Sequence, residues 1–199
     1  VPHASAIMLS DGSILGRTVG PAGEFHPLES IMAVGDDIDI WPHTVPTPSA
    51  RALQVGRATP AFGRRMTGEL GSLTAAVVGC SGTGSIVTEQ LARLGFGRLI
   101  LVDPEPVEHK NLNRVVNATW RDAEEGNSKV HVAARTIDAM GFGTIVERHA
   151  TNLISRPVVE AIAEADIIFG CVDSAEARDV LNRISTHYLL PYIDVGVRI

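Results

Sequence analysis

Two kinds of hydrophobic pattern alternate along the chain after Gly71. Short apolar runs predict strands at 74–78, 98–102, 144–148, 166–169 and 192–195. Between them, apolar residues recur at helical spacing and predict helices at 83–94, 128–140, 157–163 and 175–187. A crossover between parallel strands must bury its apolar stripe against the sheet. The alternation therefore predicts an α/β fold with a mostly parallel sheet and helices on both faces.

A different pattern precedes this region. Residues 1–41 contain apolar runs at 4–9 and 14–19, and the intervening Ser-Asp-Gly-Ser sequence at 10–13 is typical of a hairpin turn. A third strand is expected at 38–41. These residues are too few for an independent core. We therefore expect a small β-rich N-terminal segment that is either the remnant of a larger domain or a flap on the main one.

Three prolines, Pro42, Pro46 and Pro48, follow the N-terminal segment. Proline removes a backbone donor and disfavours helix at the residue before it. We therefore expect a linker at 42–50 and a main domain at 51–199. Because the chain ends directly after a predicted strand, we expect this domain to be truncated at its C-terminus.

Composition and charge exclude several classes of protein. Hydrophobic residues make up 45% of the chain and charged residues 20%, which is ordinary for a soluble globular protein. No apolar run approaches the roughly 20 residues that span a bilayer. The formal charge of −6 argues against nucleic acid and anionic membranes as partners. The chain begins with Val1 and lacks a secretory signal pattern, so we expect a trimmed, cytoplasmic protein.

A glycine-rich turn joins the strand at 74–78 to the next helix, with the sequence Gly79-Cys80-Ser81-Gly82-Thr83-Gly84. Such a turn lets backbone N–H groups and the positive end of a helix approach a phosphate or ribose, as in a Rossmann-like fold. The dinucleotide fingerprint G-x-G-x-x-G has glycine where this chain has Ser81. Tight strand-to-helix turns also use glycine for packing alone, so the turn by itself leaves both interpretations open.

Two acidic residues follow the second strand of the predicted parallel sheet. Asp103 lies 24 positions after Gly79, near the roughly 20 positions expected for a carboxylate that accepts hydrogen bonds from ribose hydroxyls. Glu105 comes two residues later, between Pro104 and Pro106. The alternative is that Asp103 only caps this turn. Two acids at the carboxyl edge of a sheet favour a role facing a ligand.

Amides and cations come next along the chain. Asn111, Asn113 and Arg114 are followed by Lys129 at the start of a predicted helix. Arginine offers a planar fork of donors and lysine a compact charge, and both suit phosphate oxygens. In an acidic protein this local group of cations favours a triphosphate site. The alternative for Lys129 is a solvated lysine at a helix end.

Asp173 follows the fourth predicted strand and precedes a helix. In a Rossmann-like sheet the chain crosses here to the other side of the first strand, so Gly79 and Asp173 should face one crevice. A carboxylate in that position can hold Mg²⁺ that bridges phosphates. The alternative is that Asp173 caps the helix, but Ser174 is at least as good a cap and leaves Asp173 available.

Taken in order, these motifs resemble the adenylation domain of the ThiF/MoeB family, which includes the ubiquitin-activating enzymes. The resemblance covers roughly residues 57–199 and rests on the glycine turn, Asp103-Pro104-Glu105, Asn111-Leu112-Asn113-Arg114, Lys129 and Cys171-Val172-Asp173-Ser174. It implies that MgATP is attacked at its α-phosphate by the C-terminal carboxylate of a ubiquitin-like or sulfur-carrier protein, which gives an acyl-adenylate and pyrophosphate.

The resemblance also implies roles for individual residues. Asp103 would hold the ribose, Asn113, Arg114 and Lys129 would bind phosphates, and Asp173 would position Mg²⁺. Members of the family are typically dimers in which an arginine ahead of the glycine turn reaches the partner's ATP. Arg57 is the candidate for this role in an expected homodimer, and Arg64 and Arg65 are its rivals.

The sequence departs from the family pattern at several points. Ser81 replaces a usual glycine, which is tolerated if its φ is negative. The two cysteines, Cys80 and Cys171, form no C-x-x-C pair, so we expect no structural zinc site and interpret both as small buried thiols. The chain ends before the region where the family places its thioester cysteine. Residues 1–41 faintly resemble the tail of JAB-type metalloprotease domains without their metal ligands.

Two other functions remain open. An NAD-dependent Rossmann oxidoreductase would use the same turn and Asp103, but it has no need of the phosphate-binding cations or of Asp173. A catalytically silent scaffold would keep the fold to bind a ubiquitin-like protein. ATP binding without turnover would indicate the scaffold.

Overall fold

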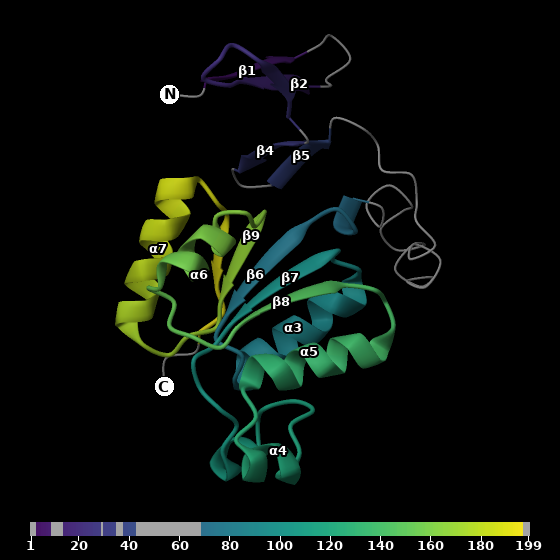
Figure 1. Ribbon diagram of the computed structural model, residues 1–199, viewed down its shortest axis with the longest axis vertical. Coiled ribbons are helices and arrows are strands. Elements are labelled where there is room, and N and C mark those ends of the chain that lie inside the picture. Colours follow the sequence, from purple (N-terminus) through teal and green to yellow (C-terminus); the bar gives the residue numbers. More distant parts are fainter. Residues whose placement is uncertain (1–2, 9–13, 29, 35–37, 43–68, 197–199) are drawn as a thin grey trace. The chain divides into compact units, whose positions relative to one another are not determined.

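The computed structural model divides the chain into two compact units, Val1–Thr47 and Pro48–Ile199 (Figure 1). It describes residues 3–8, 14–28, 30–34, 38–42 and 69–196. Most of the expected linker at 42–50 and the arginines at 57, 64 and 65 lie outside these ranges. The domain boundaries expected from the sequence therefore stay predictions.

The first unit consists of antiparallel strands. One sheet has the order β1-β2-β3 and a second pairs β4 with β5. Their bounds are β1 His3–Met8, β2 Ile14–Val19, β3 Phe25–Pro27, β4 Ser30–Val34 and β5 Ile38–Pro42. The predicted pairing of the first two strands is confirmed, with His3 opposite Val19, whereas their turn lies outside the described residues. β3 and β4 were not predicted from the sequence; β3 has only three residues, which is too few for a periodic signal.

The second unit contains a five-stranded sheet with the order β10-β9-β6-β7-β8, in which every neighbouring pair is parallel. Its strands are β6 Thr74–Val78, β7 Arg98–Val102, β8 Ile145–His149, β9 Ile167–Gly170 and β10 Tyr192–Asp194. The five predicted strands are thus all present. β6 is buried over its whole length, as expected for a central strand with helices on both faces.

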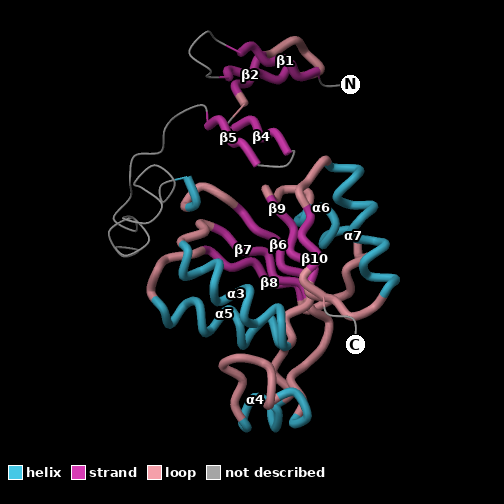
Figure 2. Tube along the Cα trace, turned by 180° about the vertical axis from the view of Figure 1, so that it is seen from behind, coloured by secondary structure: helices cyan, strands magenta, loops and turns pink. Residues whose placement is uncertain are grey.

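Helices cover both faces of this sheet, so the predicted Rossmann-like architecture is confirmed (Figures 1 and 2). The covering helices are α3 Gly82–Leu94, α5 Lys129–Met140, α6 Arg156–Ile162 and α7 Ala175–Tyr188. Alternate β6 residues supply the two cores: Ala75 and Val77 pack in the α3 and α5 layer, and Ala76 and Val78 in the α6 and α7 layer. This follows from the period of two in a strand.

The sheet grows first on one side of β6 and then on the other, so the strand order reverses at β6. From β6 the chain moves to β7 and then β8, and it later crosses to β9 on the opposite side of β6. In open parallel sheets, ligands bind in the crevice outside the carboxyl ends of the strands at such a reversal. The loops after β6, β7 and β9 meet at this edge, which is where the candidate residues were expected.

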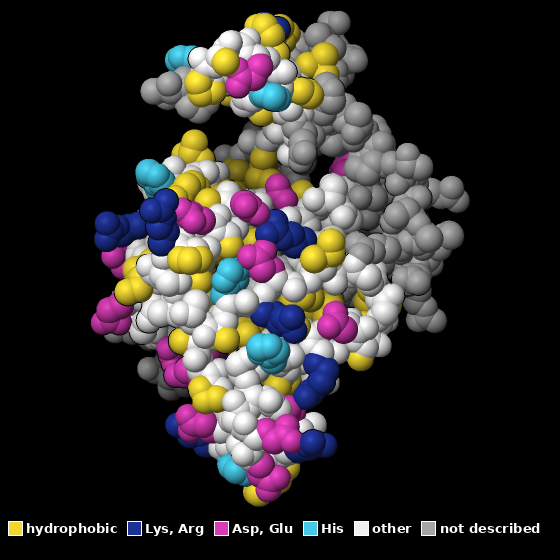
Figure 3. Space-filling model, viewed as in Figure 1, with side chains coloured by type: hydrophobic (Ala, Val, Ile, Leu, Met, Phe, Trp, Pro, Cys, Tyr) yellow, Lys and Arg dark blue, Asp and Glu magenta, His cyan; other side chains and the backbone are white. Residues whose placement is uncertain are grey.

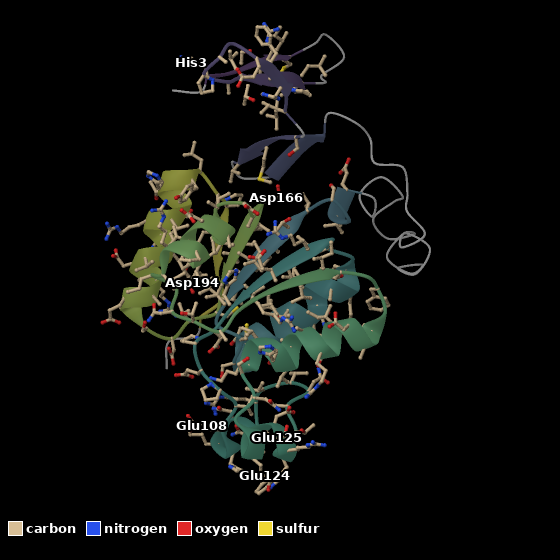
Figure 4. The ribbon with its side chains drawn as sticks, in the orientation of Figure 1. His3, Glu108, Glu124, Glu125, Asp166 and Asp194 are labelled. Carbon is tan, nitrogen blue, oxygen red and sulfur yellow. The ribbon has the colours of Figure 1, made fainter. Side chains whose placement is uncertain are left out.

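An arm interrupts the sheet between β7 and α5, and we define it as residues 104–128. It contains the short 3₁₀ helix η1 His109–Asn111 and the helix α4 Trp120–Glu125. Its two ends pair at the base, where the Val107 N–H donates to the Asn127 carbonyl at 2.8 Å. Figure 4 shows Glu124 and Glu125 on α4 at the far end of the arm. Neither helix of the arm was predicted from the sequence.

No helix within the described ranges combines the length and apolarity needed to cross a bilayer. On the face of the second unit seen in Figure 3, Lys and Arg side chains are interspersed with Asp and Glu side chains. That face therefore carries no broad basic patch of the kind that attracts nucleic acid.

Candidate functional site

The loop from Gly79 to Gly82, which we call the glycine loop, connects β6 to α3 and passes close to two other segments. Gly79 has φ +90°, and a Cβ there would lie 2.6 Å from the Cys171 carbonyl oxygen. A Cβ on Gly84 would lie 1.7 Å from the Gly79 carbonyl oxygen. Packing alone thus requires glycine at these two positions. The close fit fixes the loop against the segment after β9, which carries Asp173.

Ser81 and Gly82 differ from the two packed glycines. Ser81 has φ −84°, so a serine fits without strain, and it is the N-cap of α3 without a side-chain hydrogen bond to the helix. A Cβ on Gly82 would meet the Arg114 side chain at 3.4 Å, which is close to ordinary contact. The first turn of α3 contains no acidic residue. Its N-terminal N–H groups therefore suit an anion.

Asp103 lies directly after β7 and is only 5% exposed. One of its carboxylate oxygens accepts a hydrogen bond from the Cys80 N–H at 2.7 Å, and the other accepts from the Glu105 N–H at 2.9 Å. Burial raises the pKa of Asp103, while these two bonds and the charge of Lys129 oppose the shift. Asp103 thus joins the glycine loop to the start of the arm, and its remaining lone pairs can accept from a ribose hydroxyl.

Lys129 begins α5 and is 2% exposed, so it is not the solvated helix-end lysine considered as the alternative. Its Nζ donates to Glu105 Oε2 at 2.5 Å. The hydrogen bond and charge of Lys129 lower the pKa of Glu105. A buried cation thus stands beside Asp103 and Glu105 at the base of the arm.

The arm places its amides in different environments. Asn111 is 3% exposed and its side-chain oxygen accepts from the N–H of Glu108, the N-cap of η1, at 2.9 Å, which completes a capping box. Asn113 and Arg114 are exposed, and Arg114 Nη1 donates to the Lys110 carbonyl at 2.9 Å and to Asn113 Oδ1 at 3.3 Å. The Arg114 stem lies against Gly82. Arg114 is thus beside the start of α3, whereas Asn111 shapes the arm.

Asp173 is exposed and follows β9. Ser174, not Asp173, caps α7 by accepting from the Ala177 N–H at 3.1 Å. No hydrogen bond or ion pair to a described residue occupies the Asp173 carboxylate. The described part of the chain contains no group of three or more His, Cys, Asp or Glu side chains that could hold a metal ion. A single carboxylate fits Mg²⁺, which is usually held by one or two carboxylates together with substrate phosphates.

The two thiols lie at the same edge of the sheet. Cys80 is buried, and burial raises its pKa well above the ordinary value, with a further rise from Asp103. Burial and then Asp194 raise the pKa of Cys171 to about 11. Both thiols therefore stay protonated at neutral pH and are poor nucleophiles.

One supporting group was missed in the sequence. Asp122 on α4 is 1% exposed and accepts two hydrogen bonds from Arg135 on α5, at 2.7 Å and 2.8 Å. It also accepts from the Thr119 N–H at 2.9 Å and from Asn127 Nδ2 at 3.1 Å. The pair Asp122–Arg135, which we call the clamp, holds the arm to α5. The available signal was Thr119 followed by Asp122, a variant of the capping box.

Comparison with known proteins gives relatives and structural neighbours. The chain is 35% identical over 136 residues to ubiquitin-like modifier-activating enzyme 5 of Drosophila willistoni, covering 62% of this chain and 33% of that protein. It is 31% identical over 134 residues to the Mus musculus protein of the same name, covering 61% and 32%. The chain therefore spans about a third of the length of the curated relatives it matches.

Solved structures share the fold of the second unit. E. coli tRNA N6-threonylcarbamoyladenosine dehydratase, TcdA, in complex with ATP, matches with a TM-score of 0.68 at 22% identity, over 76% of this chain and 61% of that one. E. coli MccB with MccA matches with a TM-score of 0.64 at 25% identity, over 79% and 47%.

The sequence model of the ThiF family matches residues 54–198, which is most of the chain. This match covers every motif on which the expected resemblance rests, from the glycine loop to Asp173. It does not reach residues 1–41, whose resemblance to JAB-type domains stays a prediction. The chain therefore belongs to the ThiF family.

Proposed function

We propose that this chain binds MgATP and adenylates a carboxylate, namely the C-terminal carboxylate of a ubiquitin-like or sulfur-carrier protein. The observation that carries the proposal is the grouping of charges at one sheet edge. A buried Lys129, an exposed Arg114 and the open first turn of α3 lie around the glycine loop, and Asp173 offers an exposed carboxylate across the reversal at β6. This set suits a metal-bound polyphosphate.

Each candidate residue has a part in the proposed site. Arg114 and Lys129 offset charge on the phosphates, Asp173 holds Mg²⁺, and Asp103 accepts from the ribose while it keeps the glycine loop in place. The glycine loop and the first turn of α3 allow the backbone to approach the nucleotide closely, through Gly79, Ser81, Gly82 and Gly84. Glu105 and Asn111 shape the base of the arm, and Asn113 orients Arg114. When bound, MgATP supplies the α-phosphorus that the carboxylate attacks, with pyrophosphate as the leaving group.

The partner and the assembly are parts of the same proposal. The names of the relatives and the MccB structure with MccA support a protein or peptide substrate that ends in a carboxylate. The ATP in the TcdA structure supports the choice of nucleotide on this fold. We further propose a cytoplasmic homodimer in which Arg57 of each chain reaches the ATP of the other.

Calorimetric titration with MgATP and, separately, with NADH tests the choice of nucleotide. We expect that MgATP binds, that omission of Mg²⁺ weakens binding, and that NADH gives no signal at the same concentrations. Tight binding of NADH without binding of ATP would contradict the proposal and favour the NAD-dependent oxidoreductase instead.

A further inference from the structure

Lys129 is an unusual buried residue. It has the largest volume among the fully buried side chains of the described residues. It is also the first residue of α5, whose first turn contains no acidic side chain. The helix dipole places positive charge at this end, so a lysine here is disfavoured unless an anion lies beside it. Burial adds to that cost.

Glu105 provides the anion in this structure. Its Oε2 lies 2.5 Å from Lys129 Nζ, and its side chain is 66% exposed while that of Lys129 is 2% exposed. The Glu105 backbone is held on both sides: its N–H donates to Asp103 at 2.9 Å, and its carbonyl accepts from the Lys129 N–H at 3.2 Å. The carboxylate can therefore turn toward solvent without any movement of the main chain.

The Glu105 carboxylate also lies among several cations. Lys129 lowers the pKa of Glu105 most, and Lys110 and Arg114 lower it further. Lys129 and Arg114 are the two cations proposed to bind phosphate. The carboxylate therefore occupies a position whose electrostatic potential suits a phosphate group.

We propose that Glu105 is a resident anion that neutralises Lys129 in the nucleotide-free protein and competes with a nucleotide phosphate for it. This inference rests on the proposed function, because it assigns the competing ligand to the same site. The phosphate either displaces the carboxylate from Lys129 or binds beside it against like-charge repulsion. In both cases Glu105 lowers the affinity for nucleotide, while it keeps Lys129 in place when nucleotide is absent.

The test compares the wild-type protein with Glu105→Gln, which keeps the side-chain shape and removes the charge. Calorimetry should show MgATP binding roughly threefold to tenfold tighter in the variant. Thermal unfolding should show a lower Tm without nucleotide and a larger increase in Tm on addition of MgATP. Glu105→Asp, whose carboxylate is too short for the present contact, should show the same trends more weakly and serves if the first variant does not fold.

Glu160→Gln is the matched control. Glu160 pairs with Arg156 on α6 at 2.7 Å, and both side chains are exposed. The same chemical change there should leave the MgATP affinity and the increase in Tm at their wild-type values.

Weaker or equal MgATP binding in both Glu105 variants would overturn the inference, because it would mean that Glu105 contacts the ligand favourably or not at all. If the wild-type protein does not bind MgATP, the proposed function fails, and inorganic pyrophosphate becomes the probe. Tighter pyrophosphate binding in Glu105→Gln would then still support the resident anion. Absence of any gain with pyrophosphate would reject it.

Discussion

Asp103 and Asp173 follow the two strands that flank β6, yet they lie in opposite environments. Asp103 is buried and both of its oxygens accept backbone hydrogen bonds. Asp173 is exposed and makes no hydrogen bond to a described residue. A carboxylate with satisfied acceptors stabilises the loop around it, whereas an unpaired one at a sheet edge is available for a ligand. Asp103 therefore holds the glycine loop in place, whereas the Asp173 carboxylate is accessible to a ligand.

Substitution of Asp173 should have the largest effect on activity. Asp173→Ala is expected to lower adenylation by at least roughly 100-fold, because the variant lacks the carboxylate proposed to hold the metal. The Tm without nucleotide should stay near the wild-type value, since no described residue depends on this side chain. Asp179→Ala, which removes another exposed carboxylate from α7, is the control and should retain activity. Wild-type turnover in Asp173→Ala would remove the metal role.

The phosphate-binding cations should have the next largest effect. Arg114→Ala is expected to raise the KM for ATP roughly tenfold, with little loss of stability because the side chain is exposed. Lys129→Ala should raise the KM similarly and should also lower the Tm, because it opens a buried position. Steady-state kinetics and thermal unfolding separate the two variants. Undiminished activity in both would place the phosphate site elsewhere.

Asp103→Asn should affect stability more than Asp173→Ala does. An amide accepts hydrogen bonds less strongly than a carboxylate, and its NH₂ end would face the backbone N–H of Cys80 or Glu105. The free energy of unfolding should fall by about 1–3 kcal/mol. Denaturant unfolding measures this loss. Equal stability losses in Asp103→Asn and Asp173→Asn would erase the distinction between the two carboxylates.

The smallest effect is expected at the clamp between the arm and α5. Arg135 lowers the pKa of Asp122 far below its ordinary value, so the carboxylate stabilises the fold above the pKa of the unfolded chain. That stability is lost as the pH falls from about 4 through the lower pKa of the folded state. Asp122→Asn should cost about 1–2 kcal/mol at neutral pH, because Arg135 is half exposed. Denaturant titrations at pH 7 and pH 3 should differ less in the variant than in the wild type.

The parallel sheet could be predicted because its strands are buried apolar runs and its helices carry a regular apolar stripe. The same periodic signal placed the glycine loop, Asp103, Lys129 and Asp173 at strand or helix ends that the topology brings to one edge. The family resemblance is confirmed. The functional roles of these residues stay predictions, because they concern a ligand.

The arm could not be predicted in the same way. Its fold depends on polar contacts between distant positions, such as Asp122 with Arg135 and Glu105 with Lys129. Hydrophobic periodicity carries no information on such pairs. Nor did the sequence show that Lys129 is buried, because burial of a lysine is decided by a partner and not by its neighbours in the chain.

The most direct test of the account is exchange of labelled pyrophosphate into ATP, measured with Mg²⁺ and with small carrier proteins that end in Gly-Gly. We expect exchange that requires both the metal and a carrier, and that disappears in Asp173→Ala. ATP binding without exchange for any carrier would contradict adenylation and leave a silent scaffold with the same fold.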